Sequence, residues 1–210
     1  RDLPADFDRR MTEAARRLDL SAFALGTAAV SAALDRFTGR RDVSFAIQAA
    51  GRDDVDLEPL IGIFTNPLVM RFDIAEGETL RSHAAKVRQV VEEALENQHL
   101  PFDRLVQKLN PPRDPLRIPL VSVMFNWQRA FLQERSYGPF ELVSVPSHSP
   151  GTLYDLNINV IGRNAGWRVI IDYNATLFDE STVAEFATLF MQVMEAAAER
   201  PDTAIAALPQ

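Results

Sequence analysis

Residues Ile61–Ile74, with the sequence IGIFTNPLVMRFDI, form a long apolar run with one polar break at Thr65-Asn66-Pro67. The run is too short and too interrupted to span a membrane. A buried β-strand in the centre of a sheet, which meets a polar site halfway along, fits the pattern better. We therefore expect the fold to be built around this strand.

The position of Asn66 in the apolar run can be interpreted in two ways. A polar side chain inside an apolar strand destabilises the fold unless it is hydrogen-bonded. It can mark a bulge or strand switch with Pro67 at a sheet edge, or it can mark a break in the strand that faces a channel. The residue types alone favour the first interpretation.

The rest of the chain alternates helical and strand patterns. Apolar spacing and capping residues predict helices over 7–18, 21–38, 79–95 and 102–109 and a last helix after Asp179. Strand patterns occur over 42–48, 61–74, 120–127, 140–145, 154–161 and 167–173, with a hairpin turn at 162–166. The sequence predicts an α/β fold in which helices pack on a mixed sheet of about six strands.

Composition excludes several classes of function. Hydrophobic residues make up 47% of the 210 residues, and the net charge of −7 argues against a nucleic-acid binder. The chain has no cysteine, so it has neither disulfides nor thiolate metal sites. No signal peptide or membrane-spanning run is evident, which makes a cytoplasmic protein the expectation. The chain begins at Arg1 without Met, and we expect it to be part of a longer protein.

No complete catalytic set is visible in the residues themselves. His83, His99 and His148 lack a second histidine nearby, and no spacing suggests a metal site. We expect a structural role for His83 at a boundary position, a loop contact for His99 and a solvated place for His148. The pair Asp53-Asp54 is interpreted as a solvated surface. Nucleophile-elbow, P-loop and dinucleotide-binding motifs are absent.

Several stretches in order resemble the condensation domains of nonribosomal peptide synthetases, which belong to the chloramphenicol-acetyltransferase-like superfamily. The segment IGIFTNPLVMR at 61–71 is similar to the family motif GxFxNTLxLR, with Pro67 where Thr is usual. NQHLPFDRLV at 97–106 resembles HQDLPFERLV, and RDPLRIPLVSVMF at 113–125 resembles RDxSRNPLFQVMF. Tyr154-Asp155-Leu156 and residues 172–179 resemble the later hairpin and helix start. The resemblance covers nearly the whole chain.

The resemblance also identifies what these residues lack. The catalytic motif of the family is HHxxxDG, which lies in the N-terminal lobe, and no adjacent histidine pair occurs here. Residues 1–199 therefore resemble only the C-terminal lobe of a condensation domain, followed by an Ala/Pro-rich linker tail over 200–210. Such a lobe supplies one wall of the tunnel that carrier-protein arms enter, a crossing strand and part of the carrier docking surface.

The resemblance implies a function in a parent protein that forms amide bonds between carrier-bound acyl and aminoacyl thioesters. A non-catalytic module that docks carrier proteins is the alternative, and epimerising, heterocyclising and ester-forming members share the fold. The fragment is expected to be inactive alone. In this interpretation Asn66 and Thr65 line the substrate channel, while Arg71, Arg117 and Asp155 organise the lobe. No residue is assigned as catalytic or metal-binding.

The partners implied are the N-terminal lobe, donor and acceptor peptidyl carrier proteins and an adjacent adenylation domain. No cofactor is implied within the lobe, because the phosphopantetheine arm arrives on the carriers. The face that would meet the missing lobe is expected to be exposed and partly apolar, so the fragment is expected to self-associate. Neither nucleic acid nor a membrane is an expected partner.

Overall fold

The computed structural model describes residues 1–52, 54–115, 117–129, 135–142 and 151–209. The elements are α1 (Phe7–Arg17), α2 (Ala22–Thr38), β1 (Asp42–Ala49), η1 (Val55–Leu57), β2 (Asn66–Asp73), α3 (Leu80–Glu96), α4 (Phe102–Leu109), β3 (Val123–Arg129), β4 (Arg135–Tyr137), β5 (Phe140–Leu142), β6 (Leu156–Arg163), β7 (Gly166–Tyr173), α5 (Glu180–Glu199) and η2 (Ile205–Ala207). The predicted α/β fold is confirmed. His148 and Asp53 lie outside the described residues.

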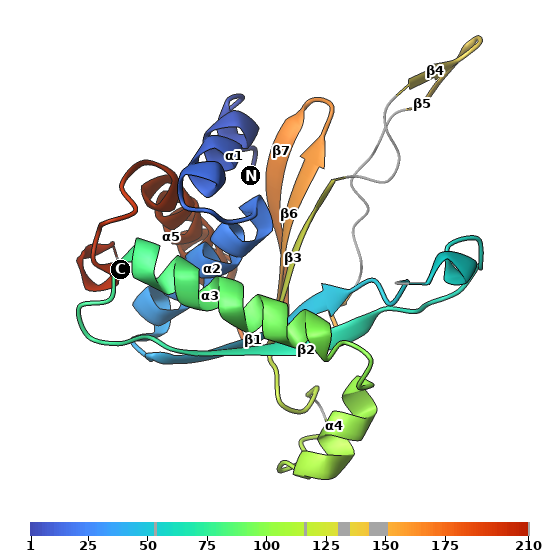
Figure 1. Cartoon of the computed structure of the whole chain (residues 1–210), viewed down its shortest axis with the longest axis horizontal. Coiled ribbons are helices and arrows are strands. Elements are labelled where there is room, and N and C mark those ends of the chain that lie inside the picture. The colour runs from blue at the N-terminus through green and yellow to red at the C-terminus, as the bar shows by residue number, and fades with distance from the viewer. Residues whose placement is uncertain (53, 116, 130–134, 143–150, 210) are drawn as a thin grey trace.

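The main sheet is mixed, as the sequence predicts. Its strand order is β2-β1-β3-β6-β7, and a separate two-stranded ribbon is formed by β4 and β5. The β1–β2 and β6–β7 pairs are antiparallel, whereas β1–β3 and β3–β6 are parallel. Figure 1 shows the sheet twisting strongly between its β1–β2 half and its β3–β6–β7 half.

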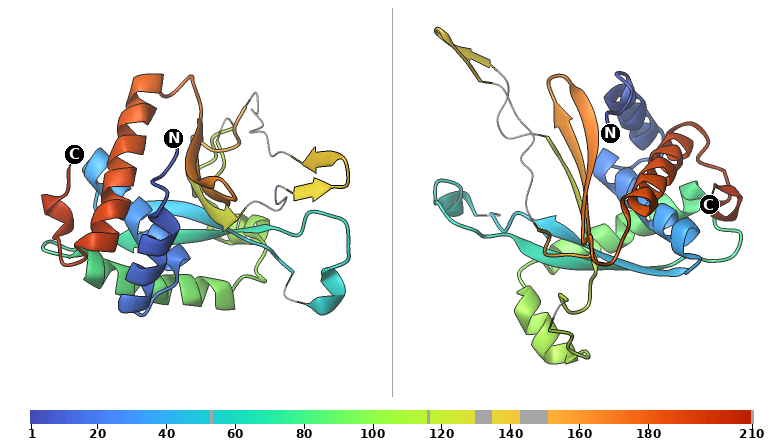
Figure 2. Two further views of the ribbon diagram at one scale, coloured as in Figure 1. Left: turned by 90° about the horizontal axis from the view of Figure 1, so that it is seen from above. Right: turned by 180° about the vertical axis from the view of Figure 1, so that it is seen from behind.

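Helices α1, α2, α3 and α5 cover one face of this sheet (Figures 1 and 2). The main hydrophobic core lies beneath them and includes the side chains of Phe45, Phe72, Phe125 and Ile158 from four neighbouring strands. Helix α2 presents mostly small buried residues, which let α3 and α5 approach it closely. Burial alternates along β6, because successive side chains on a strand point to opposite faces.

The helix ends follow the capping signals in the sequence. The Ser21 hydroxyl accepts a hydrogen bond from the Ala24 amide at 3.0 Å, and α2 ends at Gly39 with a left-handed φ of 66°. Thr79 and Ser82 form a reciprocal capping box at the start of α3. These contacts satisfy backbone groups that a helix end leaves unpaired.

The expectation of a central buried strand over Ile61–Ile74 is wrong in two respects. Only Asn66–Asp73 form a strand, and this strand, β2, lies at an edge of the sheet. Ile61 and Ile63 are 103% and 93% exposed in the projecting segment that leads into β2. The pairing stops because β1 ends at Ala49, opposite Asn66, and leaves the residues before Asn66 without a neighbouring strand.

The last residues pack on the fold, which differs from the linker that their composition suggests. The amide of Leu80 donates to the carbonyl of Thr203, and the amide of Ile205 donates to the carbonyl of Glu78. Ile205 and Leu208 are buried in the main core. Apolar side chains spaced three residues apart on η2 and just after it explain this packing, so residues 201–209 extend the folded unit.

Among the described residues, none of the single helices is long and apolar enough to cross a membrane. Helices α1 and α2 together meet the requirement of length and composition, but they are bent by 96° relative to each other.

Candidate binding site on the open face of the sheet

The face of the sheet opposite the helices is here called the open face. A small apolar cluster of Ala46, Val121 and Met124 covers one part of it, joined by side chains from α4 and the loop before β3. Farther along the strands the open face becomes polar. Asn126, Asn157, Asn159 and Asp172 lie on it, and we refer to these four residues as the amide network.

The amide network joins three strands through their side chains. The Asn126 Nδ2 atom donates to Asn157 Oδ1 at 3.2 Å and to Asn159 Oδ1 at 3.1 Å. Asn157 Nδ2 and Asn159 Nδ2 each lie 3.4 Å from Asp172 Oδ2. The register brings these residues together, because Asn126 is opposite Asn159 and Asn157 is opposite Asp172.

A hollow of about 320 Å³ opens beside the amide network. Its wall is formed by Gln48, Met124, Asn126, Gly151, Thr152, Leu153, Tyr154, Asn157 and Asp172. The hollow thus combines amides and one carboxylate with the apolar surfaces of Met124 and Leu153 and with the ring of Tyr154. Burial raises the pKa of the Tyr154 hydroxyl, which keeps this group in its neutral form. Convergent polar groups in a partly apolar concavity are typical of a binding site.

The structure places Asn66 where the chain passes round the edge of the sheet. Its Nδ2 atom donates to the carbonyls of Gln98 and Leu100, both at 2.9 Å, and its Oδ1 atom accepts from the Phe102 amide at 3.0 Å. The chain runs from α3 on the helix-covered face to Phe102, which packs in the small cluster on the open face. Asn66 therefore holds the turn between α3 and α4 against the β2 edge.

Thr65 and Arg71 lie near the same edge. Thr65 is exposed in the segment that leads into β2. Arg71 projects from β2 and makes a two-pronged ion pair with Asp42 of β1, with distances of 2.8 and 2.7 Å. Hydrogen bonding to Arg71 lowers the pKa of Asp42. Both side chains are exposed, so solvent screening limits what this pair adds to stability.

Arg117 connects the loop before β3 to the start of β6. Its Nε atom is 3.6 Å from Asp155 Oδ2 and 4.0 Å from Asp114 Oδ2. The carbonyl of Asp155 also accepts a hydrogen bond from the amide of Asn174 at 3.0 Å. These contacts fit an organising role for Arg117 and Asp155, and that role stays a prediction.

His83 is fully buried, deeper than the boundary position expected for it. Its Nε2 atom is 2.6 Å from the Ser31 hydroxyl, and its Nδ1 atom is 3.1 Å from Glu78 Oε1. Neither His83 nor Ser31 is solvent-exposed, so this serine–histidine–glutamate series joins α2 to α3 and does not reach a substrate. His99 lies on the surface in the turn that Asn66 holds.

Glu78 completes this buried cluster. Its Oε2 atom accepts hydrogen bonds from the Ala75 amide at 2.7 Å and from Lys86 Nζ at 3.2 Å. Burial alone would raise the pKa of Glu78, but the hydrogen bonds from His83, Ala75 and Lys86 outweigh it and hold the pKa at about 2. The carboxylate is therefore a structural anion.

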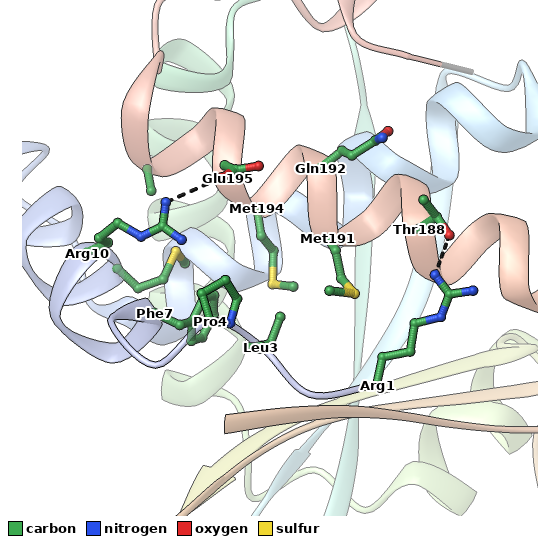
Figure 3. A pocket seen from close by; sticks show the side chains of 12 residues that line it. Arg1, Leu3, Pro4, Phe7, Arg10, Thr188, Met191, Gln192, Met194 and Glu195 are labelled. Carbon is green, nitrogen blue, oxygen red and sulfur yellow. Dashed lines mark hydrogen bonds and ion pairs between the residues drawn. The ribbon is translucent and has the colours of Figure 1, made fainter. Parts of the chain in front are cut away.

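A second cavity, of about 200 Å³, lies between the N-terminal segment, α1 and α5 (Figure 3). Leu3, Phe7 and two methionines of α5 are among the apolar residues that line it. Four of the polar side chains that line it pair with each other, since Arg10 contacts Glu195 and Arg1 donates to Thr188. This cavity lacks the convergent polar groups of the open face and is a weaker candidate for a binding site.

Sequence reasoning missed the four residues of the amide network. The signal was present in β6, where Asn157 and Asn159 alternate with Leu156, Ile158 and Val160. Asparagine is depleted in strands, so two on one strand face are unusual. In the described part of the chain, no group of three His, Cys, Asp or Glu side chains could hold a metal ion.

Comparison with known proteins identifies the family of this chain. A model of the condensation domain matches residues 1–209. The phosphinothricin tripeptide synthetase PhsB of Streptomyces viridochromogenes is 32% identical over 99% of this chain, which spans 18% of that protein. Gramicidin S synthase 2 of Brevibacillus brevis is 33% identical over 83% of the chain and 4% of its own length.

Solved structures of the same kind share the fold. The X-domain from teicoplanin biosynthesis superposes with a TM-score of 0.87 at 26% identity, over 99% of this chain and 48% of that chain. A four-domain nonribosomal peptide synthetase bound to AMP and glycine gives a TM-score of 0.90 at 22% identity, over 99% of this chain and 17% of that one. The chain has the chloramphenicol-acetyltransferase-like fold and belongs to the condensation-domain family.

Proposed function

We propose that this chain is the C-terminal lobe of a condensation domain that forms amide bonds in nonribosomal peptide synthesis. The carrying observation is that the family match fills residues 1–209, while the chain spans only 48% of the X-domain. Residues 1–199 form the lobe in this proposal, and residues 201–209 pack on it. The polar open face is the surface proposed to meet substrate.

In the proposed reaction an amine on one carrier attacks the thioester carbonyl carried by another. The carbon–nitrogen bond forms, the carbon–sulfur bond breaks, and the carrier thiol leaves with a proton. Since these 210 residues contain no adjacent histidine pair, the group that takes the amine proton is proposed to come from the N-terminal lobe. This lobe would supply binding and orientation.

Individual residues have positioning roles in this proposal. Asn66 and Thr65 border the substrate channel, and Asn66 acts by holding the 98–102 turn through its three backbone hydrogen bonds. Arg71, Arg117 and Asp155 keep the strands and the loop before β3 in place. None of these side chains is proposed to exchange a proton with substrate.

The proposed partners are the N-terminal lobe, donor and acceptor peptidyl carrier proteins, and a neighbouring adenylation domain. Condensation domains of synthetases work with carrier and adenylation domains and use no cofactor of their own. The phosphopantetheine arm is proposed to arrive on the carrier proteins, and the cell compartment is proposed to be the cytoplasm.

A transfer assay tests this function. Loaded donor and acceptor carriers are mixed with this fragment, with the same chain joined to its N-terminal lobe, and with two-lobe Asn66→Ala and Thr65→Ala variants. Products are measured by intact mass. We expect transfer only by the two-lobe proteins, with slower transfer by Asn66→Ala than by Thr65→Ala, because Thr65 borders the channel without making the three backbone hydrogen bonds of Asn66.

The alternative function is a docking module without bond formation. The synthetase relatives do not favour it. A two-lobe protein that binds both loaded carriers at stoichiometric levels but gives no amide product would support docking and overturn the proposed function.

A further inference from the structure

The hydrogen bonds of the amide network run in one direction, and Asp172 sets it. A carboxylate can only accept hydrogen bonds, so Asn157 and Asn159 must turn their NH₂ groups toward it. Their Oδ1 atoms then face Asn126, which must present its own NH₂ group to both. Reversing any amide would place two acceptors against each other.

The direction of these hydrogen bonds determines which atoms of the amide network can still bind a ligand. The NH₂ group of Asn126 is used by two acceptors, which leaves the Oδ1 atom of Asn126 as the outward end of the network. At the other end, Asp172 receives two long bonds of 3.4 Å at Oδ2, and Oδ1 keeps its lone pairs. Both groups line the same hollow. The remaining hydrogen-bonding capacity of the amide network is therefore that of acceptors, which suit a ligand that donates.

The charge in the hollow also favours a ligand that donates hydrogen bonds. Among the described residues that line it, Asp172 is the one charged side chain, and the others are amides, small residues, Met124, Leu153 and Tyr154. A carboxylate ligand would meet repulsion from Asp172 there. An amine offers several N–H donors and can carry the opposite charge, so its hydrogen bonds to a carboxylate are charge-assisted.

We propose that the hollow binds the amino group of an aminoacyl substrate through Asp172 and Asn126, with Met124 and Leu153 against its apolar part. This assignment rests on the proposed function, which it deepens by naming a positioning site for the amine. Asp172 and Asn126 are positioning residues. Deprotonation of the amine is left to the other lobe.

A binding titration tests the assignment without any transfer reaction. The chain is titrated with alaninamide, with lactamide, in which a hydroxyl replaces the amine, and with N-acetylalaninamide, followed by ¹H–¹⁵N NMR. We expect alaninamide to bind at least about tenfold more tightly than the other two, as one charge-assisted hydrogen bond predicts. Shifts are expected at residues 124–126, 152–157 and 172.

Variants separate the site from the fold. Asp172→Asn and Asn126→Ala are each expected to weaken alaninamide binding about tenfold or abolish it. Asp172→Glu is expected to retain part of the binding. Asp73→Asn, on the same sheet face but at the other edge, is the matched control and should bind as the unmodified chain does. The NMR spectrum of each variant reports whether it remains folded.

The outcomes are distinguishable from those of the transfer assay. Equal affinity for alaninamide and lactamide, or unchanged affinity in folded Asp172→Asn, overturns the assignment even if the two-lobe protein forms amide bonds. Selective amine binding that Asp172→Asn removes supports the assignment even if transfer fails. In an active two-lobe protein, Asp172→Asn should raise KM for the amine substrate more than it lowers kcat.

Discussion

Asn66 makes its three side-chain hydrogen bonds to backbone groups within five residues of each other. Such a side chain is hard to replace, because its loss leaves two carbonyls and one amide without partners at a turn. Its effect on any activity therefore passes through the position of the 98–102 turn and of Phe102, which packs on the open face.

Replacing Asn66 with alanine is expected to lower the free energy of unfolding by about 1–3 kcal/mol, the usual cost of polar groups left unpaired. Urea denaturation measures this change, and faster hydrogen exchange at the Phe102 amide localises it. Thr65→Ala, at an exposed neighbour, is the control. Equal stability of Asn66→Ala and the unmodified chain would contradict a holding role for Asn66.

The low pKa of Glu78 predicts how the free energy of unfolding depends on pH. Its pKa of about 2 lies below the ordinary value of 4.5, so the folded state favours the carboxylate. The contribution is complete above about pH 4.5 and is lost as the pH falls toward 2. Glu78→Gln should therefore show a shallower decline of unfolding free energy over this range.

The control for this experiment is Glu76→Gln, since the Glu76 side chain is 90% exposed in the same turn. Its decline with pH should match that of the unmodified chain. A Glu78→Gln profile as steep as the unmodified one would show that other carboxylates cause the acid sensitivity.

At single positions, sequence reasoning identified Asn66 and missed the amide network for one physical reason. Asn66 interrupts an apolar run, so its polarity is conspicuous. Asn157 and Asn159 alternate with apolar residues, which is also the pattern of an ordinary solvated strand face. Only the pairing of β6 with β3 and β7 brings Asn126 and Asp172 to them, and pairing between distant strands is not encoded in local periodicity.

At the scale of elements, two tryptophans pack between α2 and the part of the sheet formed by β3, β6 and β7. Trp127 and Trp167 have ring centroids 5.2 Å apart, and each ring lies against a glycine. A Cβ atom at Gly26 would lie 2.5 Å from the Trp127 ring, and one at Gly162 would lie 2.7 Å from Trp167. The absence of a side chain at these positions permits the contact.

Gly26→Ala tests this packing against an opposing tendency. Alanine in a helix is favoured over glycine by about 1 kcal/mol. Overpacking costs about 1–3 kcal/mol, and the Trp127 ring, held by Trp167 and Phe7, has little room to move. We expect a net loss of stability and altered tryptophan fluorescence.

Gly151→Ala is the control for adding a methyl group without a clash, because a Cβ atom there would meet open space. A more stable Gly26→Ala protein with unchanged fluorescence would show that α2 can shift and that the glycine is not required for packing.

Element types were largely predictable, whereas their places in the sheet were not. Caps at Ser21, Gly39 and Thr79 and the hairpin near Gly166 are local signals, and the structure confirms them. The apolar segment at 61–65, by contrast, was wrongly predicted to belong to a buried strand. Hydrophobicity there matched a buried strand, but a strand needs a neighbour, and β1 ends at Ala49.

For the molecule as a whole, two projections reach away from the helices, one carrying η1 and the other carrying β4–β5 (Figure 2). Large apolar side chains are exposed on both, with Val55 at 78%, Ile61 at 103%, Ile63 at 93% and Phe140 at 74%. Exposed apolar surface of this kind is typical of an interaction site. We therefore expect the isolated chain to self-associate.

Sedimentation at increasing protein concentration tests whether the chain self-associates. The average mass should rise above that of a monomer, and the double change Ile61→Lys and Ile63→Lys should reduce the rise. Leu177→Lys, at an exposed leucine away from both projections, should leave it unchanged. A single monomeric species of the unmodified chain at high concentration would contradict the prediction.

The strand order has a consequence for how the chain folds. β1 and β3 are in register at only two pairs, Ala46 with Met124 and Ile47 with Phe125, whereas β3 and β6 are in register over seven. The β1–β2 and β6–β7 partners are closer in sequence and need shorter loops to be closed than the β1–β3 pair. We therefore expect each half of the sheet to assemble early and the two-residue strip between β1 and β3 to close last, and we expect the native protein to open first at this strip.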